Sequence, residues 1–172
     1  MKFKILSMVA ATALLVSCGS TRYNSSSHPA YNVPTAIATT FDAQYPTATN
    51  VVWTTYDPAV AIPIDWELTD WSTLDEQDYM ATFDMGSDKM YAWFDANGAW
   101  VGTTYAISNF SSLPSAINAT LKDKYPNYTI ESVQREMWRE KNAYEIKLKS
   151  GDTKSKVLVD MNGNIIKQKD KY

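Results

Sequence analysis

The sequence predicts an α+β fold: a tandem repeat of a helix followed by a four-stranded antiparallel meander, forming one curved sheet or two packed units. Two internal similarities predict it. Residues 34–46 align with residues 114–126 at a constant offset of 80. Residues 79–86 and 95–98 align with residues 144–151 and 160–163 at a constant offset of 65. Two blocks that each keep a constant register indicate a duplicated unit, with an insertion of 15 residues in its first copy.

The composition is that of a globular protein. Of the 172 residues, 45% are hydrophobic and 20% are charged, and the formal net charge is −3. One cysteine excludes an intrachain disulfide and a cysteine-cluster zinc site, and one histidine excludes a histidine-rich metal site. The net charge gives no electrostatic basis for nucleic-acid binding. No cofactor and no metal is therefore expected.

The first residues resemble a bacterial lipoprotein signal. Lys2 and Lys4 precede an apolar stretch over residues 5–16, which is too short to span a bilayer. The stretch leads into Leu-Val-Ser-Cys-Gly at residues 15–19, which is similar to a lipobox. This resemblance implies cleavage before Cys18, lipidation of its sulfur, and attachment to a membrane through the N-terminal lipid.

Two alternatives for this segment remain open: an ordinary signal peptide or signal anchor with a chance cysteine, and a catalytic Cys18 paired with His28 in a flexible tail. On the leading interpretation, residues 1–17 are a signal peptide and residues 18–33 a polar, serine-rich tether. The protein is then expected in the bacterial cell envelope, facing the periplasm or the cell surface.

Two helices are predicted by apolar residues with helical spacing. Ile37, Phe41 and Tyr45 are spaced i, i+4, i+8, and residues 117, 121 and 125 repeat this spacing. A proline stands at a plausible first helical position in each copy, and the Tyr-Pro pairs at residues 45–46 and 125–126 end the helices.

Eight strands are predicted from β-branched and aromatic runs separated by turn residues. They cover residues 50–56, 79–85, 89–94, 99–105, 128–138, 143–149, 155–159 and 164–168. The Asp-x-Asn-Gly sequences at residues 95–98 and 160–163 predict hairpins. They do not fit a calcium loop, because their glycine and their twelfth residue do not match that pattern.

Tryptophan is concentrated in the first copy. Trp66 and Trp71 lie in the insertion, residues 57–77, among acidic residues, and Trp93 and Trp100 flank the first Asn-Gly turn. Together these four residues form the candidate binding surface, since exposed aromatic residues anchor protein interfaces and also stack on sugars. The alternative is that the tryptophans of the insertion cover the core.

Charge is divided unevenly along the chain. Residues 18–110 hold two basic and eleven acidic residues, a net charge of −9, whereas residues 111–172 hold twelve basic and eight acidic residues, a net charge of +4. The lysines of the second part predict a basic strand face, formed by Lys147, Lys149, Lys154, Lys156, Lys167, Lys169 and Lys171. Such a face is either simply solvated or turned toward an anionic partner.

The sequence gives no sign of catalysis. It lacks a histidine base in the body, a glycine-rich phosphate loop and a G-x-S-x-G elbow. Asp65 and Glu67 could act together on one strand face, but nothing else supports a glycosidase. We therefore expect a protein that is not an enzyme.

The same residues resemble the PepSY-like, beta-lactamase-inhibitor-protein-like domains of bacterial envelope lipoproteins. The resemblance rests on the Tyr-Pro helix ends, the Val-Trp at residues 52–53, the stretch 92–100 with its Asp-Ala-Asn-Gly, and the Val-Asp-Met-Asn-Gly at residues 159–163. It covers roughly residues 34–170 and implies a curved antiparallel sheet whose concave face binds another protein. The namesake inhibitor carries disulfides, which one cysteine does not allow here, so no inhibitory residue is carried over.

The sequence thus predicts four parts: the signal peptide, the tether, a first PepSY-like repeat over residues 34–110 and a second over residues 111–172. The predicted function is a non-catalytic, lipid-anchored envelope protein that binds a protein or peptide through its sheet face. The alternative is a module that binds carbohydrate or another small ligand through exposed tryptophans.

Overall fold

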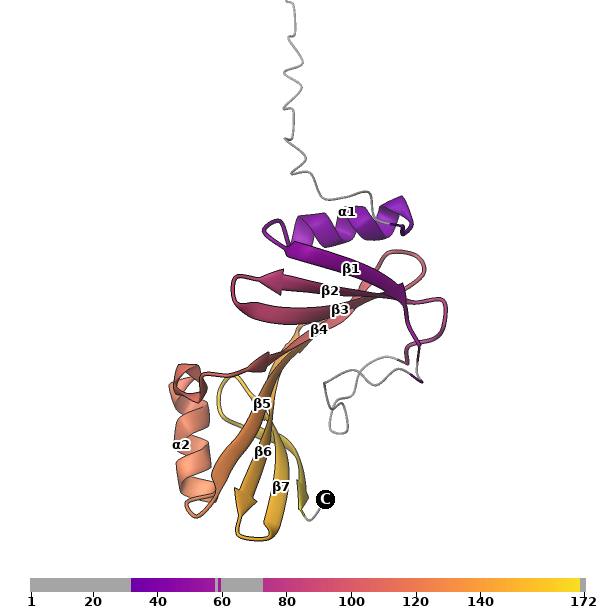
Figure 1. Ribbon diagram of the computed structural model, residues 1–172. Helices are drawn as coiled ribbons and strands as arrows, with labels where there is room; N and C mark the ends of the chain where they lie inside the picture. Colours follow the sequence, from indigo (N-terminus) through magenta and orange to yellow (C-terminus); the bar gives the residue numbers. More distant parts are fainter. Residues whose placement is uncertain (1–31, 58, 60–72, 171–172) are drawn as a thin grey trace, which may run out of the picture.

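The protein forms one open antiparallel sheet with two short helices (Figure 1). The computed structural model describes residues 32–57, 59 and 73–170. The helices are α1 (Thr35–Gln44) and α2 (Ser115–Lys124), and a single 3₁₀ turn, η1 (Phe110–Ser112), precedes α2. The strands are β1 (Thr49–Thr55), β2 (Tyr79–Met85), β3 (Asp88–Phe94), β4 (Trp100–Ile107), β5 (Thr129–Trp138), β6 (Lys141–Ser150), β7 (Thr153–Asp160) and β8 (Ile165–Asp170). Each pairs with the next in chain order.

The predicted strand segments are confirmed, but the predicted fold class is wrong. The chain is a single eight-stranded meander and not a tandem of helix-plus-four-strand units. The reason lies at β4 and β5, which pair directly over five positions, from Thr103↔Met137 to Ile107↔Val133. The hydrogen-bonded ladder therefore runs through the point where the sequence predicted a boundary, and no strand edge separates two units.

Both helices begin one residue later than predicted. Pro34 and Pro114 occupy the N-cap positions with ψ angles of 140° and 139°, so each proline precedes the first helical residue. The helices end as predicted, because Tyr45 and Tyr125 are the C-caps and the following prolines cannot continue the helix.

The main part of the core consists of two clusters on one side of the sheet. Ile37 and Phe41 of α1 pack on Phe83 and Phe94, with ring centroids of Phe41 and Phe83 5.0 Å apart in an edge-to-face arrangement. The second cluster is aliphatic and joins α2 to β5–β7; it includes Ile117, Leu121, Ile146, Leu148 and Val157. Each helix therefore covers its own part of the sheet.

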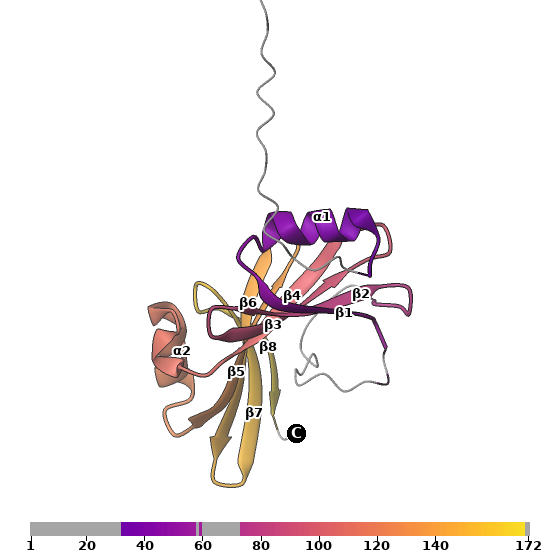
Figure 2. The ribbon, with the colours of Figure 1, turned by 45° about the horizontal axis from the view of Figure 1, so that its top comes forward.

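The sheet bends between β4 and β5, and α1 and α2 both lie on the outer side of the bend (Figures 1 and 2). The strand register agrees, because Met90, Tyr105, Arg135 and Tyr144 face one another across β3 to β6 on the side of the helices. The opposite side carries no helix in the described part of the chain, and we call it the helix-free face. Among the described residues no helix has the length and apolarity needed to cross a membrane.

Candidate functional site

The helix-free face of β5–β8 carries most of the basic side chains predicted to share a face. Because side chains alternate along a strand, residues opposite one another in the register point to the same side. Lys147 lies opposite Lys156, which lies opposite Lys169, and Lys149 lies opposite Lys154. Lys167 lies opposite Leu158 on the same face. The prediction that these six lysines share one face is therefore confirmed, although Lys156 is buried there, and Lys171 lies outside the described residues.

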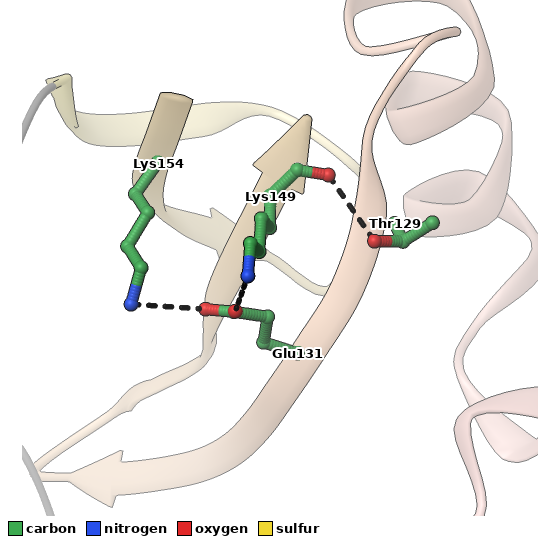
Figure 3. A network of polar contacts seen from close by, with 4 residues as sticks. All are labelled: Thr129, Glu131, Lys149 and Lys154. Carbon is green, nitrogen blue, oxygen red and sulfur yellow. Dashed lines mark hydrogen bonds and ion pairs between the residues drawn. The ribbon is translucent and has the colours of Figure 1, made fainter. Parts of the chain in front are cut away.

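A bulge in β5 brings a carboxylate among these lysines. The register shifts between Ile130 and Ser132, which leaves Glu131 unpaired in the ladder. Its Oε1 lies 3.8 Å from Lys149 Nζ, and its Oε2 lies 3.7 Å from Lys154 Nζ (Figure 3). The hydroxyl of Thr129 donates to the Lys149 carbonyl at 3.1 Å and fastens the same two strands together. Glu131 thus partly neutralises the outer end of the basic face.

The inner part of the same face contains a buried ion pair. Lys156 Nζ lies 4.0 Å from Glu145 Oε1, and the two side chains are 0% and 1% exposed. Removing such charges from water costs several kcal/mol per ion, so they persist only when each has partners. Glu136 and Gln134 are also buried on this face. The helix-free face is therefore a packed polar layer at its centre and an exposed basic surface at its edges.

An apolar pocket of about 370 Å³ opens on this face beside the lysines. Its floor is made of the buried Trp138, Ala143 and Leu158, which form a cluster of their own. Met161 and Ile166 stand at its rim and are 39% and 48% exposed. Exposed large apolar residues around a concave apolar floor indicate a place where a partner's side chain can be buried.

Charged and polar groups surround the mouth of the pocket. The Lys141 ammonium lies 5.7 Å from the centre of the Trp138 ring, within reach of a cation–π interaction. Asp160 forms the turn beside the pocket, where its Oδ1 accepts hydrogen bonds from the backbone N–H groups of Asn162 and Asn164, both at 2.8 Å. Burial opposes ionisation of Asp160, but these bonds and the one from the Asn164 amide outweigh it and lower the pKa. These hydrogen bonds thus fix the conformation of the turn that follows Asp160.

Of the four tryptophans proposed from the sequence, the structure describes Trp93 and Trp100, and neither is fully exposed. Trp93 has no exposed surface, and its ring stacks on Tyr91 with centroids 6.4 Å apart. Trp100 is half-buried against the α1 cluster, and its Nε1 donates to Thr103 Oγ1 at 2.9 Å. Trp66 and Trp71 lie outside the described residues, as does Cys18, so the predictions for these three residues stay predictions.

Sequence reasoning missed the residues of the apolar pocket, although a signal was present. Trp138 and Leu158 alternate with core residues and share the face of the lysines. A large apolar residue on a face otherwise occupied by charged residues marks a local apolar site. That pattern would have identified the floor of the pocket. It would not have identified Met161 and Ile166, because the β7–β8 turn brings these two residues to the rim of the pocket.

The described residues offer little for metal binding. No group of three or more histidine, cysteine, aspartate or glutamate side chains in ranges 32–57 and 73–170 is arranged to hold a metal ion. The helix-free face combines an apolar pocket, exposed lysines and a turn held by hydrogen bonds.

Comparison with known proteins gives the same fold. A family model described as "Putative beta-lactamase-inhibitor-like, PepSY-like" matches residues 77–167. A BLIP-like protein from Bacteroides fragilis has a TM-score of 0.62 at 19% identity, covering 80% of this chain and 86% of that one. A DUF2874 family protein from Bacteroides ovatus has a TM-score of 0.61 at 20% identity, covering 80% and 87%.

A third similar structure, from Bacteroides eggerthii, is described as one of the "putative periplasmic proteins". It has a TM-score of 0.58 at 17% identity and covers 80% of this chain and 88% of its own. None of the curated proteins matches the chain. At these identities the structural likeness shows the fold alone.

Proposed function

Since the chain belongs to the PepSY-like, beta-lactamase-inhibitor-like family, we propose that it is a non-catalytic protein of the cell envelope that binds a protein or peptide through its helix-free face. The family has an inhibitor-like fold. The observation that carries the proposal is the apolar pocket between β5–β6 and β7–β8, which is open, rimmed by exposed Met161 and Ile166, and lined at its mouth by Lys141.

The chemistry of this face defines the partner. An apolar side chain of the partner enters the pocket and covers Trp138 and Leu158, while acidic groups around it lie over Lys141, Lys167 and Lys169. Buried apolar anchors supply most of the affinity in protein interfaces, and complementary charge speeds association and selects the partner. We therefore propose an acidic protein segment that carries one exposed apolar residue.

The N-terminus provides the location. The charged start, the apolar stretch and the lipobox-like residues 15–19 support lipidation at Cys18 and attachment to an envelope membrane. Metabolic labelling with a fatty-acid analogue should mark the wild-type protein and leave Cys18→Ala unlabelled. Labelling that persists in Cys18→Ala would contradict the proposed anchor.

Capture of a partner from envelope extract tests the binding face. The full chain in detergent is immobilised as wild type, as Ile166→Asp and as the matched control Val52→Asp, which alters another exposed apolar residue, 58% exposed on β1. A protein partner should be retained by wild type and Val52→Asp and lost from Ile166→Asp, which places a charge at the pocket rim.

Both substitutions are at exposed positions, so both variants should keep the melting temperature of the wild type. This measurement shows whether each variant is folded. Equal capture by all three proteins would show that the pocket is not the docking surface. Loss from Val52→Asp with retention by Ile166→Asp would place the partner on β1 instead.

A further inference from the structure

A second cavity lies on the other side of the sheet, on the face that carries the helices. It has a volume of about 280 Å³ and occupies the region between the α1 cluster and the α2 cluster, near the junction of β4 and β5. Its lining is mostly polar and includes Tyr105, Ser108, Asn109, Ser112, Arg135 and Tyr144. The two core clusters leave this polar gap because each helix covers only its own part of the sheet.

The guanidinium of Arg135 is held in one orientation in this cavity. Its Nε donates to Asn142 Oδ1 at 3.1 Å, and its Nη1 donates to the Tyr105 hydroxyl at 3.1 Å. Its central carbon lies 5.7 Å from the centre of the Tyr144 ring. These three contacts come from β4 and β6, the strands on either side of β5, so the planar group is fixed before any ligand arrives.

Arg135 has no acidic partner in the described part of the chain. Its two hydrogen bonds go to neutral groups, which leaves the other N–H groups of its five without a described acceptor. Asp88 lines the same cavity from the first position of β3, but no ion pair between described residues joins it to Arg135. A half-buried cation that is oriented and carries unused donors is a site for an anion.

The shape of the group selects the anion. A guanidinium presents parallel N–H donors that match the two oxygens of a carboxylate, which makes this pairing stronger and more directional than a contact with lysine. The hydroxyl of Ser108 and the amide of Asn109 also line the cavity and can complete the coordination. A volume of about 280 Å³ lies just below the range of roughly 300–1,000 Å³ typical of pockets for drug-sized ligands. It therefore suits a small group or one end of a chain.

We propose that this cavity is a carboxylate-binding site, in which Arg135 takes a carboxylate of a peptide through the N–H groups that its neighbours leave unused. The carboxylate is either the C-terminus of the peptide or an aspartate or glutamate side chain. The site lies on the face opposite to the helix-free face, so the proposal stands or falls independently of the function proposed above.

Short synthetic peptides distinguish the two sources of carboxylate. Three versions of one neutral tetrapeptide are titrated into the full chain in detergent: one with a free C-terminus, one amidated, and one amidated with an internal glutamate. Binding is followed by the NMR signal of the Arg135 Nε–H group, which lies in the cavity. A shift with the first peptide only identifies a C-terminal site, and a shift with the third identifies a side-chain site. The amidated neutral peptide should have no effect.

Two variants and a control test the role of charge. Arg135→Gln should weaken binding at least tenfold, because it removes the charge and the bidentate donors. Asp88→Asn should strengthen binding about threefold, because it removes a negative charge from the cavity while leaving Arg135 and its contacts in place. Arg139→Gln removes an exposed positive charge from the β5–β6 turn and should leave the affinity unchanged.

Several outcomes would overturn the proposal. These are no shift with either carboxylate peptide, equal binding of the amidated neutral peptide, or an affinity that Asp88→Asn leaves unchanged or weakens. If Arg135→Gln fails to fold, the Asp88→Asn comparison still decides the outcome, because Asp88 is an exposed residue at the start of β3.

Discussion

Tyr45 both packs in the core and forms a buried hydrogen bond through its hydroxyl. The sequence placed Tyr45 at the end of the first helix as a packed aromatic residue, and the structure confirms this position. The structure adds a polar function, because the buried hydroxyl is hydrogen-bonded to Thr103 Oγ1 on β4. Burial raises the pKa of Tyr45 to about 12, although hydrogen bonds to Thr103 and Trp100 act in the opposite direction. The phenol is therefore held neutral at pH values where an exposed tyrosine ionises.

This shift predicts a loss of stability in alkali. In the unfolded chain Tyr45 loses its proton near pH 10, whereas in the folded protein it keeps the proton up to about pH 12. Stability is therefore full below pH 10 and falls between pH 10 and 12 as the unfolded state ionises first. Two pKa units correspond to about 3 kcal/mol.

Urea unfolding at pH 9, 10, 11 and 12 measures this contribution. In Tyr45→Phe, the fall in unfolding free energy over this range should be smaller than in wild type by about 2 kcal/mol, because the full difference is reached only above pH 12. Burial also raises the pKa of Tyr91, Tyr125 and Tyr144, so some decrease remains in the variant. A decrease of the same size in both proteins would contradict the assignment to Tyr45.

Residue positions were predictable where they depend on alternation along a strand. The shared face of the lysines followed from their spacing, and the register confirms it. Trp93 and Trp100 were not predictable in this way. Their burial depends on long-range packing: Trp93 lies within a bent sheet, and Trp100 follows a bulge that shifts the register between Trp93 and Phe94.

At the scale of elements, the two Asp-x-Asn-Gly turns join strands and also contact the helices. Only their glycines have positive φ angles, +91° at Gly98 and +84° at Gly163. The turns also form the surface on which the helices rest. A Cβ at Gly163 would lie 2.6 Å from the Ala116 carbonyl oxygen, and one at Gly98 would lie 3.0 Å from the Ala36 carbonyl carbon. The hairpin signal was visible in the sequence, whereas this close approach to a helix was not.

Gly163→Ala should therefore destabilise the protein more than a matched glycine substitution. Gly151 has φ +58° and no atom within 4 Å of its would-be Cβ, so Gly151→Ala carries only the backbone strain, about 1–2 kcal/mol. Gly163→Ala carries comparable strain and must also displace α2, which adds about 1–3 kcal/mol. The Thr120 hydroxyl, which donates to the Gly163 carbonyl at 2.7 Å, would lose this bond.

Thermal and urea unfolding of the two variants measures the difference. Equal loss of stability in Gly163→Ala and Gly151→Ala would show that the helix is not seated on the turn. Gly98→Ala should resemble Gly163→Ala, because its Cβ also meets helix backbone.

At the scale of the molecule, the sequence identified the elements and not the way they are joined. Local patterns marked eight strands and two helices, because periodicity, turn residues and helix-ending prolines act over a few residues. The pairing of β4 with β5 is a contact between segments separated by α2, and no local pattern encodes it. For that reason the duplicated sequence predicted a tandem of helix-plus-four-strand units, whereas the structure is one continuous eight-stranded meander.

Continuity of the sheet predicts a single unfolding transition. Met137 of β5 packs against the α1 cluster, so the two parts share packing as well as hydrogen bonds. Met137→Ala should lower the unfolding free energy by about 2 kcal/mol, near the lower end of values for such truncations because the side chain is only half-buried.

Native-state hydrogen exchange tests the coupling. In Met137→Ala, the most protected amides of β2–β3 and of β6–β7 should lose the same amount of protection. Lower protection in one group alone, or two separate transitions in urea, would contradict a single cooperative sheet.

The meander order of the strands also has a consequence for the rate of folding. Every strand pairs with its neighbour in the chain, so most loops that must close are short, and a low contact order favours fast folding. Two connections are longer: the one from Ile107 to Thr129, which contains α2, and the one from Thr55 at the end of β1 to Tyr79 at the start of β2. Closing a longer loop costs more entropy, and β1 is paired on one side only. We therefore expect β1, with α1 above it, to join the sheet late in folding and to leave it first during unfolding.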